Sequence, residues 1–141
     1  MCRDSRARLS PKEAAAVDAW LHSGRHAHVM RDHILHHDLI LPGLWGARCD
    51  GGRLLHMAER IKRFLSTGAL QGMERKFLAK EIWPAIRDDC QIHDSYYPNF
   101  DAQPFPAMGK GNDQFHLGMG ITGEAALRRE AQALGLRWPL A

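Results

Sequence analysis

Apolar residues recur along the chain with the spacing of short helices that alternate with short strands. The segment Ser10–Glu13 reads Ser-Pro-Lys-Glu, which places a capping serine, a proline and a glutamate as in a capping box. Val17, Trp20 and Leu21 then share one helical face until Ser23-Gly24. The pattern predicts a helix of about three turns that starts at Pro11.

Three further segments have helical periodicity. From Leu54 to Leu65 the apolar positions lie on one face, with Arg60, Lys62 and Arg63 mostly on the other. A second helix is predicted after Gly72, ending or kinking at Trp83-Pro84. A last helix is expected over residues 125–134, capped by Thr122.

Short apolar runs between these segments predict strands. Ala27–Met30 leads into the polar Arg31-Asp32-His33, and Ile92 into His93-Asp94-Ser95, while residues 115–117 could form a last strand. Residues 39–46 are apolar but interrupted by proline and glycine, so a helix is not expected there. The alternation predicts an α/β or α+β fold, with about four strands and four helices in one domain over 1–141.

Composition is that of an ordinary globular protein, with 45% hydrophobic and 25% charged residues. No apolar run approaches the roughly 20 residues of a membrane span, and no signal peptide is recognisable, so a cytoplasmic location is expected. The odd number of cysteines, 3, without a C-x-x-C pair, indicates reduced thiols.

Charge is unevenly distributed between the halves. Residues 1–70 carry eleven Lys and Arg against seven Asp and Glu, a balance of +4, whereas residues 71–141 carry eight against nine. A phosphate-bearing partner would suit the basic half. A nucleic-acid partner is not predicted, because no aromatic-interleaved basic stripe, RNA-binding signature or zinc-finger spacing is present.

Histidine is concentrated in the first half, where seven of the 9 lie. His26 with His28, and His33 with His36 or His37, could form ligand pairs for zinc, copper or nickel, which makes a histidine-rich metal binder one alternative. No carboxylate or cysteine spacing completes a four-ligand set. His93 and Asp94 could ligate a cation or act as base and orienting group, or simply form a strand end and turn.

Several ordered blocks together resemble a family of GT-A-like glycosyltransferases, over residues 3 to about 118. The family pattern contains R-D-x-D-S-R, A-V-x-x-W-L, M-R-D-H, G-x-W-G, G-x-D-Q-x-F-L, H-D-S-Y and F-P. The corresponding segments here are Arg3–Arg8, Ala16–Leu21, Met30–His33, Gly43–Gly46, Gly72–Leu78, His93–Tyr96 and Phe105-Pro106.

The resemblance implies a partial GT-A-like mixed sheet flanked by helices and transfer of a sugar from a nucleotide-sugar donor to a glycan or other acceptor. It implies a divalent cation, manganese or magnesium, on Asp4 and His93, which would neutralise the departing diphosphate. Glu74 and Asp94 would be catalytic. The implied substrate-binding residues are Arg3, Arg8, Arg31, Asp32, His33, Trp45 and Gly46.

The chain departs from this pattern at identifiable positions. Arg6 replaces the second aspartate of the metal pair, and Glu74-Arg75 replaces D-Q. Only three residues precede Asp4, where the family has a strand-rich donor-binding half, so the chain is expected to bind nucleotide-sugars weakly or not at all. The alternative is a non-catalytic binding or assembly module, which predicts self-association through an uncovered sheet edge.

Overall fold

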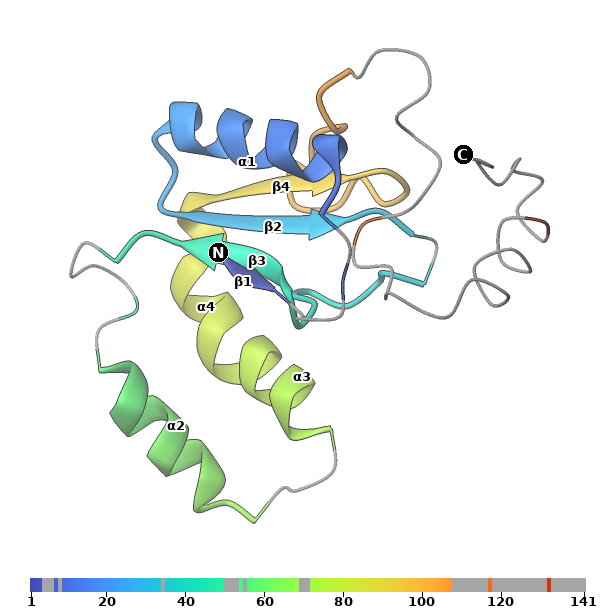
Figure 1. Ribbon diagram of the computed structural model, residues 1–141. Helices are drawn as coiled ribbons and strands as arrows, with labels where there is room; N and C mark the ends of the chain where they lie inside the picture. The colour runs from blue at the N-terminus through green and yellow to red at the C-terminus, as the bar shows by residue number, and fades with distance from the viewer. Residues whose placement is uncertain are drawn as a thin grey trace.

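A four-stranded mixed sheet with helices on both faces organises the protein (Figure 1). The computed structural model describes residues 1–3, 7, 9–33, 35–49, 54, 56–68, 72–107, 117 and 132. The strands, in sheet order, are β1 (Cys2–Arg3), β3 (Leu44–Ala47), β2 (Ala27–Arg31) and β4 (Cys90–Asp94). β3 is antiparallel to both β1 and β2, whereas β2 and β4 are parallel. The predicted α/β class is confirmed.

Helix α1 (Pro11–Ser23) covers one face of the sheet and has the predicted ends. The Ser10 side chain accepts a hydrogen bond from the Glu13 backbone N–H, and Gly24 ends the helix in the left-handed conformation. Only this half of the predicted capping box forms. The Glu13 carboxylate instead pairs with Arg3, so it ties β1 to the start of α1.

The other face of the sheet is covered by a longer helical run (Figure 1). This run consists of α3 (Met73–Phe77), the π-helical turn η1 (Leu78–Ile82), α4 (Trp83–Ile86) and the 3₁₀ turn η2 (Arg87–Asp89). Pro84 lacks the N–H that a regular helix needs, and the π-helical turn lies immediately before it. The helical path therefore continues past Pro84 with an irregularity, as predicted for a kink. Helix α2 (Met57–Leu65) packs outside this run, where Phe64 contacts Phe77.

Alternation along β2 divides the core into two clusters. Val29 packs with Ile82 and Ile92 on the side of α3 and α4. Met30 packs with Ala16 on the side of α1. Because successive residues of a strand point to opposite faces, Arg31 lies on the α4 side and Asp32 follows on the α1 side. This alternation decides which partners each charged side chain meets.

Strands β1 and β3 were not predicted from the sequence. β3 contains Gly46, which has a low intrinsic preference for strands and is extended here because β3 pairs with β2. A Cβ at Gly46 would lie 3.3 Å from two atoms of the Trp20 ring, so glycine lets α1 approach the sheet closely. The predicted strand at 115–117 and the last helix lie outside the described residues, apart from Leu117 and Gln132.

Candidate functional site

The carboxyl ends of the parallel strands β2 and β4 bring charged residues together. Arg31 and Asp94 are direct neighbours in the strand register, although 63 positions separate them in sequence. Asp32 and Ser95 follow them in the same order. Ligands of α/β proteins commonly bind at the carboxyl ends of parallel strands. We refer to Lys12, Arg31, Asp32, Asp94 and Ser95 as the strand-end cluster.

Arg31 and Asp94 form a buried ion pair on the α4 side of the sheet. Arg31 Nε donates to Asp94 Oδ2 at 2.5 Å, and the two side chains are 4% and 1% exposed. Asp94 Oδ1 accepts from the backbone N–H groups of Tyr96 and Tyr97, each at 2.8 Å. Both oxygens of this carboxylate therefore have partners. Such an arrangement favours a positioning role for Asp94 over the catalytic role that the resemblance implies.

Asp32 gathers partners from three separate segments on the α1 side. Its Oδ1 accepts from Lys12 Nζ at 2.7 Å and from the Ser95 hydroxyl, and its Oδ2 accepts from the Leu117 N–H at 3.2 Å. The Asp32 side chain is 4% exposed. Lys12 also lies over the Phe105 ring, 4.8 Å from its centre. Ser95 is exposed, so the hydroxyl that donates to the buried Asp32 carboxylate belongs to a surface residue.

The strand-end cluster balances two cations with two carboxylates. Lys12 pairs with Asp32 and Arg31 with Asp94, one pair on each side of the sheet. Arg31 Nη1 donates two long hydrogen bonds, each of 3.4 Å, to the carbonyl oxygens of Asp38 and Leu39. Within the described part of the chain its buried Nη2 has no hydrogen-bond acceptor. The cluster thus holds a buried donor without a partner among the described residues.

A buried chain of hydrogen bonds links Gln91, His93 and His28 on the α1 side. His28 Nε2 lies 2.7 Å from His93 Nδ1, and Gln91 Nε2 lies 3.2 Å from His93 Nε2. The Trp20 ring stacks on His28 at 5.5 Å. Burial, together with the nearby His93, lowers the pKa of His28 from 6.5 to about 3. Burial lowers the pKa of His93 to about 4, so both imidazoles are neutral at pH 7.

The described residues do not fit the metal that the resemblance implies. Both ring nitrogens of His93 have protein partners, and this side chain lies in the interior. No three histidine, cysteine or acidic side chains of the described residues are grouped so that they could hold a metal ion. Asp4, its expected co-ligand, lies outside the described residues, as does Arg6.

The remaining predicted site residues are dispersed. Arg3 pairs with Glu13, and Glu74 is exposed on α3. Trp45 is half-buried on β3, where it packs against the core, and Gly46 faces Trp20. His33 follows Asp32 directly and its ring lies 5.5 Å from that of His36. Arg8 lies outside the described residues.

Lys12 is the member of the cluster that sequence reasoning did not single out. It occupies the first turn of α1, where a lysine carries no distinctive motif, and its partner Asp32 is 20 positions away. The only available signal was that the first turn of a helix often faces the carboxyl ends of the strands it covers in an α/β fold.

Comparison with known proteins adds no further constraint. None of the helices in the described ranges has the length and apolar character needed to cross a membrane. No protein family, no curated protein and no solved structure matches this chain.

Proposed function

We propose that this chain is part of a GT-A-like glycosyltransferase and that the strand-end cluster is its sugar-facing site. One observation carries the proposal. The blocks Met30–His33 and His93–Tyr96, in which the resemblance implies substrate-binding, metal-binding and catalytic residues, form neighbouring ends of parallel strands. Segments 63 positions apart thereby contribute to one charged cluster, as a shared site requires.

Asp32 is the candidate base in this proposal. Sugar transfer requires removal of a proton from the acceptor hydroxyl, which a nearby carboxylate can accept. Asp32 Oδ1 already accepts the Ser95 hydroxyl, so a hydroxyl of an acceptor could take the place of Ser95 there. Lys12 Nζ, 2.7 Å from Oδ1, orients this carboxylate. Asp94, held by Arg31 and two backbone N–H groups, fixes the start of the loop that carries Ser95.

Arg31 supplies the anion-facing group. Its Nε is held by Asp94, and its Nη2 lacks an acceptor among the described residues. A guanidinium with one edge fixed and one donor unused suits a sugar or phosphate oxygen. Binding of the nucleotide-sugar donor is expected to be weak, because Arg6 replaces the second aspartate of the metal pair that the resemblance implies.

The test is saturation-transfer NMR with a panel of nucleotide-sugars at millimolar concentration. We expect weak saturation of the sugar protons that is lost in Asp32→Asn and reduced in Ser95→Ala. Matched controls are Asp18→Asn on the exposed side of α1 and Ser66→Ala at the end of α2. Absence of saturation, or saturation that is equal in all four variants, would refute the proposal.

A second candidate, a non-catalytic assembly module, is favoured by the exposed apolar side chains on α2. Ile61 is 41% exposed and Leu65 50% exposed, and β1 ends the sheet on one side. Light scattering over a hundredfold concentration range tests this function. A concentration-dependent dimer that Ile61→Lys abolishes would support it, and a monomer throughout would exclude it.

A further inference from the structure

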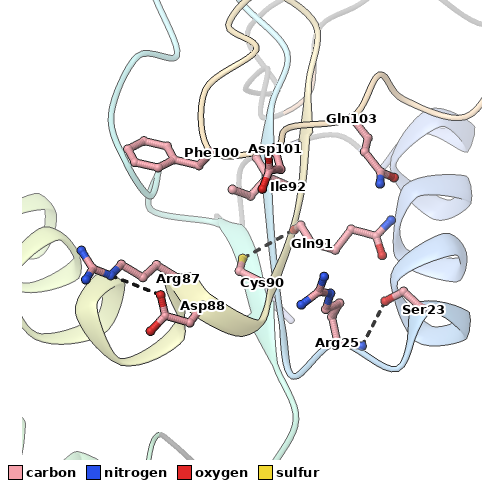
Figure 2. Close-up of a pocket in the computed structure, with 10 residues that line it drawn as sticks. All are labelled: Ser23, Arg25, Arg87, Asp88, Cys90, Gln91, Ile92, Phe100, Asp101 and Gln103. Carbon is pink, nitrogen blue, oxygen red and sulfur yellow. Dashed lines mark hydrogen bonds and ion pairs between the residues drawn. The ribbon is translucent and has the colours of Figure 1, made fainter.

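A polar pocket lies beside the first residues of β4, at the end of this strand opposite to the strand-end cluster (Figure 2). Its volume is about 530 Å³, within the range of small-molecule sites. It is bounded by the end of α1 with the loop that follows, by η2, and by the turn at residues 99–102. None of its lining residues belongs to the strand-end cluster.

Four polar side chains converge on this pocket from different segments. Figure 2 shows Ser23, Arg25, Gln91 and Gln103 directed toward the space between β4 and α1. Two carboxamides, a hydroxyl and a guanidinium offer both donors and acceptors. The Ser23 hydroxyl already donates to the Trp20 carbonyl and accepts from the Arg25 N–H, so the carboxamides and the guanidinium are the groups that favour a ligand with many hydrogen-bonding groups.

The charges that line the pocket balance. Arg87 Nε lies 3.5 Å from Asp88 Oδ1, and Asp101 is the second lining carboxylate. Arg25 Nη1 lies 3.8 Å from Asp89 Oδ1. A phosphate would meet the carboxylates and a metal cation would meet the guanidinium groups. The pocket therefore suits a neutral ligand.

Unused hydrogen-bonding groups lie at the pocket. Gln91 donates through Nε2 to His93, while its buried Oε1 has no hydrogen-bond donor within the described ranges. Among the described residues, the outer edge of β4 is paired where Gln103 donates to the Ile92 carbonyl and accepts from the Asp94 N–H. By alternation, the Ile92 N–H faces the same outer side.

The turn that closes the pocket has a strained backbone. The Ala102 N–H donates to the Asn99 carbonyl at 3.2 Å, and the two residues between them, Phe100 and Asp101, have φ of 59° and 57°. Such turns normally use Asn-Gly, because the Cβ of most other residues clashes with the backbone at positive φ. Strain of this kind concentrates at ligand sites. Here it holds the Asp101 carboxylate beside the pocket.

We propose that this pocket binds a compact, neutral saccharide of one or two rings. Hydroxyl groups both donate and accept, which matches carboxamides, guanidinium groups and carboxylates that together carry no net charge. An extended peptide fits less well, because Gln103 leaves only about three residues, or about 10 Å, of β4 edge open. The inference stands independently of the sugar-transfer proposal, since it requires binding alone and uses other residues.

The experiment is saturation-transfer NMR of the whole chain with glucose, galactose, N-acetylglucosamine and maltose. The variants are Arg25→Met, which keeps the aliphatic stem, and Asp101→Asn, which keeps a residue type that tolerates positive φ. Matched controls are Arg63→Met and Asp18→Asn, both on exposed helix surfaces away from the pocket. Thermal unfolding of each variant verifies that it is folded.

We expect at least one saccharide to show saturation of its ring protons, with about tenfold weaker binding in each pocket variant and unchanged binding in the controls. Asp32→Asn should leave this binding intact, which separates the pocket from the strand-end cluster. The inference is overturned if no saccharide is saturated, if the controls weaken binding equally, or if inorganic phosphate or an extended peptide displaces the saccharide from the pocket.

Discussion

Replacing the buried pair His28 and His93 with glutamine should flatten the dependence of stability on pH. Both imidazoles are neutral in the folded protein, because their pKa values are lowered from 6.5 to about 3 and about 4. In the unfolded chain they titrate near the ordinary value. Below that value the unfolded state binds more protons than the folded state, so the free energy of unfolding falls as the pH falls.

The size of this effect follows from the linkage relation. Each histidine that is protonated only in the unfolded state lowers the free energy of unfolding by about 1.4 kcal/mol per pH unit. At about pH 6.5 the unfolded histidines are half protonated, so between pH 6.5 and pH 5 the two together should remove about 3 kcal/mol. Domains of this kind have about 5–15 kcal/mol in total, so the loss should be large.

Urea unfolding at pH 7, 6 and 5 measures the effect. The double variant His28→Gln/His93→Gln should be less stable at pH 7, because it loses the stack on Trp20, but should depend less steeply on pH. His37→Gln, which changes an exposed histidine, is the matched control and should keep the steep dependence. If the native protein and the double variant lose stability in parallel between pH 6.5 and pH 5, the reasoning about this buried pair is wrong.

Three further predictions concern packing, buried charge and thiol reactivity. Gly46→Ala should lower the free energy of unfolding by about 1–3 kcal/mol in thermal unfolding, because its Cβ would lie 3.3 Å from the Trp20 ring. Adding Trp20→Phe to the same chain should recover part of that loss. Strictly additive effects of the two substitutions would contradict this steric explanation. Arg31→Met should lower the free energy of unfolding by about 3–5 kcal/mol, because it leaves the Asp94 carboxylate buried without its partner. Arg63→Met, which breaks the exposed pair with Glu81, should cost at most about 1 kcal/mol. Equal losses of the two variants in urea unfolding would show that the pair of Arg31 with Asp94 is not effectively buried. Burial raises the pKa of Cys90 to about 12. At pH 8 iodoacetamide should therefore modify the exposed Cys49 much faster than Cys90, which mass spectrometry can follow. Comparable rates of modification at the two thiols would count against the burial of Cys90.

Local signals predicted those parts of the fold that local interactions determine. The cap at Ser10 and the stop at Gly24 located α1, and the apolar run before Arg31 located β2. β1 and β3 were not predicted. β1 has two residues and β3 is a tetrapeptide that contains glycine, so each forms a strand only because a neighbouring strand pairs with it.

The candidate site shows the same division. Arg31, Asp32 and Asp94 were expected at strand ends, and they lie there. Of the histidine pairs expected from spacing, the rings of His33 and His36 lie 5.5 Å apart, whereas the buried pair joins His28 to His93, 65 positions away. No spacing rule reports a contact across two strands whose order in the sheet is unknown.

The parallel pairing of β2 with β4 also bears on how fast the chain can fold. β2 and β3 are close in sequence, whereas the register of Arg31 with Asp94 closes a loop of 63 residues. The entropy cost of that closure precedes any gain from the sheet, so β2–β4 docking is expected to come late and to set the folding rate. Substitutions at the Val29–Ile92 contact should then slow folding, whereas changes within α1 should mainly speed unfolding. Pairing of β2 with β4, which assembles the strand-end cluster, would thus also be the folding step that establishes the native topology.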